Sequence, residues 1–163
     1  MSLDRRQLFL ALLLTMALPV PTLAQTVREV HGAHDAWAEP GLALAWGVLR
    51  GPDETRTRVV IRIEADAQRH AGLRASGRDP FGGGSVDLPV QRDADGAWHI
   101  DLPRSHFADH PRTELRFQAP GQSAPGLLVY FQGVPDTTPE SSTALQLDES
   151  LRSRLAGARA ALR

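Results

Sequence analysis

The sequence feature that most constrains the fold is a two-residue period of apolar side chains through the middle of the chain. In residues 58–65, Ile61 and Ile63 fall on one face, while Arg62 and Glu64 fall on the other. Successive side chains of a β-strand point to opposite faces, so this pattern predicts a strand with one buried and one solvent-facing side. Further segments with the same alternation are residues 85–91, 97–102 and 114–118.

Two other segments, residues 42–49 and 126–132, are apolar on both faces. We predict that they are central strands, because a strand covered on both sides reads as a continuous apolar run. Residues 26–30 add a predicted edge strand. Residues 93–96 end in glycine and predict a short hairpin loop. Pro89 interrupts an alternating segment and indicates an edge strand or a bulge, because proline has no N–H to donate.

Six or seven short strands separated by Gly/Pro turns predict a mainly all-β fold. We expect an antiparallel, immunoglobulin-like β-sandwich over residues 25–142. The chain has no cysteine, so only the architecture is predicted and not the disulfide of true immunoglobulin domains. The stability of such a domain must come from its apolar core, which a chain of this length is able to bury.

The apolar period changes from two residues to that of a helix in residues 143–163. Leu147, Leu151, Leu155 and Leu162 fall on one stripe of a predicted C-terminal amphipathic α-helix. Two interpretations are open. The stripe packs against the protein's own sandwich, or these four leucines bind a partner protein.

Residues 1–24 are typical of a cleavable export signal. Arg5 and Arg6 form a basic start, an apolar run of 13 residues follows, and small residues precede a predicted cleavage after Ala24. The apolar run is shorter than the roughly 20 residues that span a bilayer. The arginine pair and the Gln-Leu-Phe-Leu after it resemble a twin-arginine signal, which implies export of the folded protein. An ordinary secretory signal is the alternative, and both routes predict a periplasmic protein whose mature chain starts at Gln25.

The composition excludes several kinds of chemistry. The chain has no cysteine and no lysine, which excludes thiol catalysis, zinc–thiolate and iron–sulfur sites, Schiff-base lysines and a phosphate-binding P-loop. Without residues 1–24 the chain has 16 basic residues (18 − 2) and 18 acidic residues (19 − 1). This slightly acidic balance predicts that the protein does not bind nucleic acid. No membrane contact is expected once the signal is removed.

Three of the six histidines lie within residues 98–110. His99, His106, His110 and Asp101 are the candidate ligands of a zinc or copper(II) ion. The four-residue spacing of His106 and His110 would place both imidazoles on one face of a helical turn. The alternative is that these histidines are solvated or hydrogen-bonded, because no complete metal-binding motif is present. A second, weaker pair is His31 with His34.

No serine lies in the strand-to-helix turn that a catalytic nucleophile requires, and no carboxylate pair is singled out as a catalytic site. Without a predicted catalytic residue or cofactor, we expect a non-catalytic accessory or binding protein. It would act on another periplasmic protein through its loops, with residues 81–84 and 105–110 as the first candidates, or through its C-terminal helix. The alternative function is metal binding or metal delivery by histidines.

Overall fold

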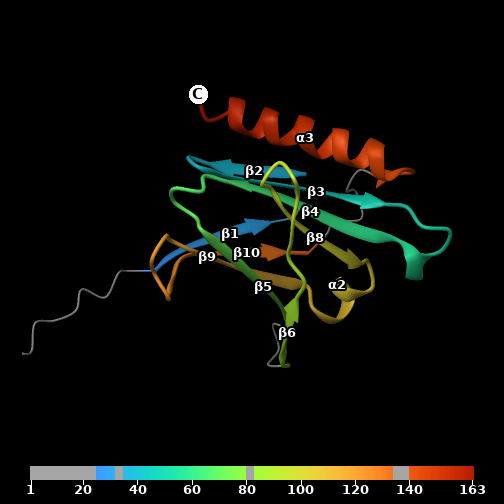
Figure 1. Ribbon diagram of the computed structural model, residues 1–163. Helices are drawn as coiled ribbons and strands as arrows, with labels where there is room; N and C mark the ends of the chain where they lie inside the picture. Colours follow the sequence, from blue (N-terminus) through green and yellow to red (C-terminus); the bar gives the residue numbers. More distant parts are fainter. Residues whose placement is uncertain (1–24, 32–34, 80–82, 134–139) are drawn as a thin grey trace, which may run out of the picture.

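Alternating apolar residues build two β-sheets that face each other across a common core (Figure 1). The computed structural model describes residues 25–31, 35–79, 83–133 and 140–163. The predicted export signal, His34 and residues 81–82 of the predicted binding loop lie outside the described residues. Within the described residues, no helix combines the length and the hydropathy needed to cross a bilayer.

The first sheet, here sheet A, has five strands in the order β1-β10-β9-β5-β6. Strand β1 pairs with β10 in parallel, and the other neighbours are antiparallel. β1 is an edge strand and β10 is an internal strand, as predicted. The strands are β1 (Thr26–His31), β10 (Pro125–Gln132), β9 (Arg112–Gln118), β5 (Gly72–Arg78) and β6 (Ser85–Leu88).

The second sheet, sheet B, has the order β11-β3-β4-β8-β7, and β2 also pairs with β3. The antiparallel pairs are β2–β3, β3–β4, β4–β8 and β7–β8, whereas the short β11 runs parallel to β3. The strands are β2 (Ala36–Glu39), β3 (Leu42–Leu49), β4 (Arg58–Ala65), β7 (Gln91–Arg92), β8 (Trp98–Pro103) and β11 (Glu140–Ser141).

The main core lies between the two sheets. Trp46 of β3 packs edge-on against Phe131 of β10, with ring centroids 4.8 Å apart. The alternating residues that were predicted to share a face do so, because Ile61 and Ile63 are fully buried in this core. Other core residues are Leu44, Val48, Val59, Trp98, Ile100, Leu102, Leu115, Phe117, Leu127 and Val129.

A second, smaller core lies on the outer face of sheet B, under helix α3 (Ala144–Ala160). Leu147, Leu151 and Leu155 are buried there against the small residues Ala43 and Ala45 of β3. The continuous apolar run of β3 is explained by this arrangement, because one face contacts the main core and the other contacts α3. Each buried leucine side chain contributes about 2 kcal/mol of burial free energy.

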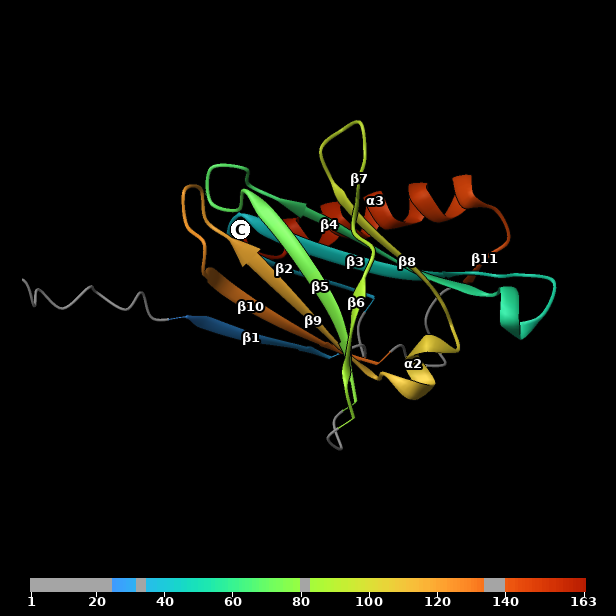
Figure 2. The same ribbon diagram turned by 60° about the horizontal axis from the view of Figure 1, so that its bottom comes forward.

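Two short helices complete the connections, the 3-10 helix η1 (Glu54–Arg56) and helix α2 (His106–Asp109). Figure 2 shows both on one side of the sandwich. Phe107 of α2 is buried in the main core. The predicted helical turn around residues 105–110 is therefore present, and its apolar residue packs it onto the sandwich.

The predicted fold class, a mainly β sandwich with a C-terminal helix, is confirmed, with three differences in detail. More strands form than the predicted six or seven, and two of them pair in parallel. Residues 85–91 are not one strand: the chain leaves sheet A after Leu88 and enters sheet B at Gln91, on either side of Pro89. The outer face of β4 is not solvent-facing along its whole length, because Val60 packs with the leucines of α3 and Arg62 is only 1% exposed.

Candidate functional site

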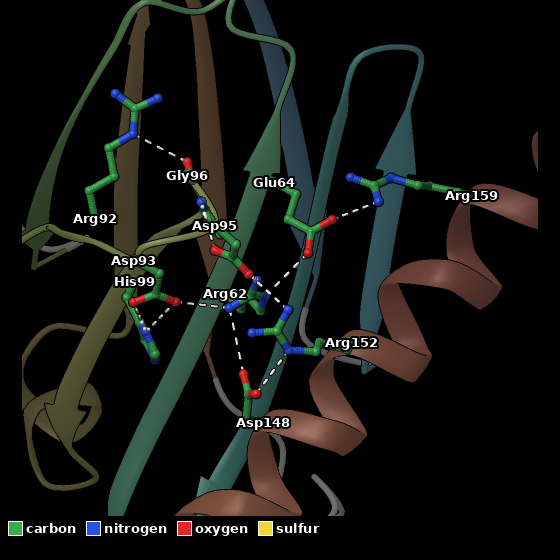
Figure 3. A network of polar contacts seen from close by, with 11 residues as sticks. Arg62, Glu64, Arg92, Asp93, Asp95, Gly96, His99, Asp148, Arg152 and Arg159 are labelled. Atoms are coloured by element: carbon green, nitrogen blue, oxygen red, sulfur yellow. Dashed lines mark hydrogen bonds and ion pairs between the residues drawn. The ribbon is translucent and has the colours of Figure 1, made fainter.

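A buried arginine under helix α3 organises the polar contacts on the outer face of sheet B (Figure 3). Arg62 of β4 forms ion pairs with four carboxylates. Its guanidinium lies 2.8 Å from Asp93, 3.2 Å from Glu64 and 3.5 Å from Asp148, and it also donates to Asp95. These carboxylates come from β4, from the β7–β8 loop and from α3, so Arg62 joins three separate segments.

Helix α3 supplies further arginines to the same network. Arg152 donates to Asp148 and Asp95, both at 2.8 Å, and Arg159 lies 2.6 Å from Glu64. The three arginines and four carboxylates therefore nearly balance. We define these seven residues, Arg62, Glu64, Asp93, Asp95, Asp148, Arg152 and Arg159, as the sheet B network.

The contacts within the network favour the charged forms of Asp95 and Arg62. A hydrogen bond from the Ala97 backbone, followed by the hydrogen bond from Arg62, lowers the pKa of Asp95 to about 2. Burial acts to lower the pKa of Arg62, but its hydrogen bonds to Asp95 and Glu64 outweigh burial and raise it. An open cleft of about 510 Å³ borders the network beside Glu39 and Gly41. The ion pairs of this network therefore hold α3 against β4 and the β7–β8 loop.

His106 and His110, two of the predicted metal ligands, lie together at the α2 end of the sandwich. Their rings are stacked, with centroids 4.8 Å apart and planes 13° apart. The space for His106 exists because β5 has a glycine there: a Cβ on Gly77 would lie 2.7 Å from His106 Nε2. Burial and, to a smaller extent, the neighbouring His110 lower the pKa of His106.

The other two predicted ligands lie elsewhere and have partners of their own. His99 contacts Asp93 at 3.2 Å, and Asp101 accepts a 2.7 Å bond from Arg58. Stacked imidazoles direct their nitrogen lone pairs side by side rather than toward one point. Among the described residues, no three histidine or carboxylate side chains are grouped in a way that could hold a metal ion.

The outer face of sheet A carries a second arginine cluster, which the sequence analysis did not anticipate. Arg74 lies directly opposite Arg116 across the β5–β9 pair, and Arg78 lies opposite Arg112. These side chains point away from the core, because the alternate residues Ala75 and Leu115 are buried in it. Like charges directly opposite each other in a sheet destabilise it. We define the sheet A arginines as Arg74, Arg78, Arg112 and Arg116.

One buried carboxylate partly compensates for these charges. Glu114 of β9 is 3% exposed, lies 2.7 Å from Arg78 and accepts a hydrogen bond from Arg116. The guanidinium of Arg112 stacks on Tyr130, 3.8 Å above the ring centre. Arg74 has no hydrogen bond or ion pair with any of the residues that the structure describes.

Next to the arginines, the same face has an apolar strip. Val27 of β1 lies opposite Leu128 of β10, and Tyr130 follows on the same side of that strand. Val27 is 49% exposed. In Figure 1, the outer face of sheet A lies on the side of the molecule away from α3, and no described segment covers it.

The predicted partner-binding leucines divide into two groups. Leu147, Leu151 and Leu155 are 1–3% exposed because they contact sheet B, as the first of the two interpretations required. A partner could reach them only if α3 left the sheet. Leu162 follows the helix and is 48% exposed.

No protein-family model matches the chain, and neither a curated protein nor a solved structure is significantly similar to it. Function therefore has to be argued from the two arginine clusters and the histidine pair themselves. The available sequence signal for sheet A was the alternation of Arg74, Ser76 and Arg78 with small residues in β5.

Proposed function

We propose that the protein is an exported, non-catalytic accessory protein of the periplasm that binds an acidic surface of another protein. The binding surface is the outer face of sheet A. The observation that carries this proposal is the cross-strand pairing of arginine with arginine, Arg74 opposite Arg116 and Arg78 opposite Arg112, on a face that no described segment covers.

Charge complementarity supports an acidic partner. The cross-strand arginines repel one another, and Glu114 is the only carboxylate among the described residues that contacts two of them. Carboxylates of a partner would relieve this repulsion. Arginine forms paired hydrogen bonds with carboxylates, so the gain includes orientation as well as charge.

The composition of the face also resembles that of known protein interfaces. Arginine and tyrosine are enriched in interfaces and at their energetic centres. On this face they occur together, with Arg112 stacked on Tyr130 beside Leu128 and Val27. On the sheet B side, α3 already covers the apolar residues Ala43, Ala45 and Val60, and the arginines of the network are paired with carboxylates.

The periplasmic location rests on residues 1–24, whose pattern is that of an export signal. The non-catalytic role rests on the composition and on the described side chains. Neither the sheet B network nor the histidine pair presents a nucleophile beside a base, as covalent catalysis would need.

Site-specific photo-crosslinking in the cells that make the protein tests this proposal. A benzophenone amino acid is placed at Val27 or Glu29, on the sheet A face, and at Leu145 as a matched control on α3. Leu145 is 69% exposed, so it samples the opposite side of the molecule. We expect one adduct of defined mass from the sheet A positions, identified by mass spectrometry as a protein with an acidic segment at the linkage.

Raised salt concentration should reduce this adduct, because complementary surface charges are screened. An adduct formed from Leu145 alone, or no adduct from either sheet A position, would contradict the proposal. An adduct at a basic or purely apolar segment would also contradict it, since the argument requires carboxylates.

A further inference from the structure

A hollow of about 390 Å³ lies at the margin of the sheet A face, where β6 leaves the sheet. Strand β6 pairs with β5 only from Ala75 to Arg78. Pro89 then directs the chain to sheet B, so the next stretch of β5 has no partner strand on that side. The polar side chains that line the hollow are Arg74, Ser76, Asp87 and Arg116.

Arg74 brings a positive charge to this hollow that forms no ion pair among the described residues. Arg74 and Arg116 lie opposite each other, and Glu114 forms an ion pair with Arg116 alone of the two. Arg74 has no polar partner within the described part of the chain. Two neighbouring guanidiniums and the hydroxyl of Ser76 form a set of donors that suits a carboxylate.

The remaining lining selects among anions. Asp87 lies opposite Ser76 across the β5–β6 pair and faces the same hollow. Its negative charge opposes a ligand with several charges, such as a phosphate dianion, but it accepts a hydrogen bond from a peptide N–H. Leu88 and Val90 add an apolar wall that a methylene stem would contact. A singly charged carboxylate on a short apolar stem, next to a backbone N–H, satisfies all of these groups.

We propose that this hollow binds the side chain of a glutamate or aspartate in an extended segment of the partner protein. The proposal rests on the proposed function for its biological source, since the partner supplies the acidic residue. The chemistry of the site stands on Arg74, Arg116, Ser76 and Asp87 alone.

Nuclear magnetic resonance titration tests the site directly. The ¹⁵N-labelled chain from Gln25, which contains every described helix and strand, is titrated with acetyl-Ala-Glu-Ala-amide. We expect amide shifts confined to residues 73–76, 87, 88, 90 and 116. The matched tripeptide with glutamine in place of glutamate should bind on the order of tenfold more weakly, as expected for loss of a charge-assisted hydrogen bond.

Arg74→Gln should weaken binding of the glutamate tripeptide by a similar factor of about ten. Arg56→Gln is the matched control, because Arg56 is 71% exposed on η1 and should leave the affinity unchanged. Equal binding of the two tripeptides, or equal loss in both variants, would overturn the proposal. Tighter binding of inorganic phosphate than of the glutamate tripeptide would also overturn it, because Asp87 should then have opposed the ligand.

The two proposals fail separately. Tripeptide binding at the hollow without photo-crosslinks from Val27 or Glu29 would leave the carboxylate site in place and contradict the proposed function. Crosslinks to an acidic partner without tripeptide shifts would place the partner elsewhere on the sheet A face and remove the hollow from its recognition.

Discussion

The two outer faces of the sandwich each carry a cluster of arginines, and the clusters are built in opposite ways. On sheet B, Arg62 is surrounded by four carboxylates, and a helix covers the result. On sheet A, arginines lie opposite arginines, and Glu114 is the carboxylate that divides its two oxygens between Arg78 and Arg116. The first cluster is electrostatically complete within the molecule, and the second is not.

This difference shows how one residue type serves two purposes in the same fold. A buried arginine that donates to three carboxylates, as Arg62 does, holds together the elements that carry them. Arginines that repel their cross-strand neighbours reduce the stability of the isolated protein, and such a cost is expected where a surface is kept for binding. Substitutions of arginine should therefore have opposite effects on the two faces.

The largest effect is expected from Arg62→Met. The change removes the cation shared by Glu64, Asp93, Asp95 and Asp148, so these carboxylates repel one another beneath α3. Breaking a buried ion pair in this way should lower the free energy of unfolding by about 3 kcal/mol. Urea unfolding measures this value.

Arg58→Met is the matched control for that experiment. Arg58 lies on the same strand and pairs with Asp101, but both side chains are more than one-third exposed. The loss should stay below about 1 kcal/mol. If the two variants were equally stable, the sheet B network would contribute no more to stability than an exposed ion pair does.

Leu151→Ala tests whether α3 belongs to the protein's own core. Leu151 is 1% exposed against sheet B, so truncation should destabilise the protein by about 3 kcal/mol. Leu145→Ala, on the exposed side of the same helix, should change stability by less than about 0.5 kcal/mol. Thermal unfolding of both variants decides between packing and partner docking: a stable L151A protein would favour docking.

On sheet A, substitutions of Glu114 and Arg74 should change the stability of the protein in different directions. Glu114→Gln removes the carboxylate between Arg78 and Arg116 and should destabilise the fold by about 1–3 kcal/mol. Arg74→Gln removes a repelling charge and should leave stability unchanged or raise it by about 0.3 kcal/mol. A clear loss of stability in R74Q would show that Arg74 stabilises the fold. It would contradict the inference that the arginines of the two faces affect stability in opposite directions.

The smallest effect is a pH dependence at the α2 end. The pKa of His106 is lowered in the folded protein, so the unfolded chain binds more protons between that pKa and about 6.5. The contribution of neutral His106 to the free energy of unfolding is therefore complete above pH 6.5. The free energy of unfolding should decrease as the pH falls through this window. Urea unfolding between pH 7.5 and 5 should show this slope, and His106→Gln should reduce it. An unchanged slope in H106Q would assign the effect to other groups.

The sequence predicts the sandwich because its apolar residues alternate. Ile61, Ile63, Ile100 and Leu115 all lie in the core that their spacing indicated. The leucine stripe of residues 143–163 likewise predicted the helix, which spans Ala144–Ala160. These features are local, so a short window of sequence contains them.

The arginine clusters were not predictable in the same way. The pattern predicted a solvent-facing Arg62, because nothing in its own strand shows that the β7–β8 loop and a helix from far along the chain contact it. Strand β5 was missed because its core-facing positions include Ala75 and Gly77, which give a weak alternation. His106 and His110 were correctly placed on one side of a turn, but their stacking and the distant positions of His99 and Asp101 depend on tertiary contacts.

The parallel pairing of β1 with β10 has a consequence for how the chain folds. Thr26 and Leu127 are register partners, so β1 pairs with a strand that lies about a hundred residues later in the sequence. Closing a loop of that length costs conformational entropy before the strands gain any stabilising contact. Proteins with many such long-range contacts fold slowly. We expect the local β3–β4 pair to form early and β1 to join last. An early intermediate would then expose the edge of β10, which makes that edge the place where misassembly between chains would begin.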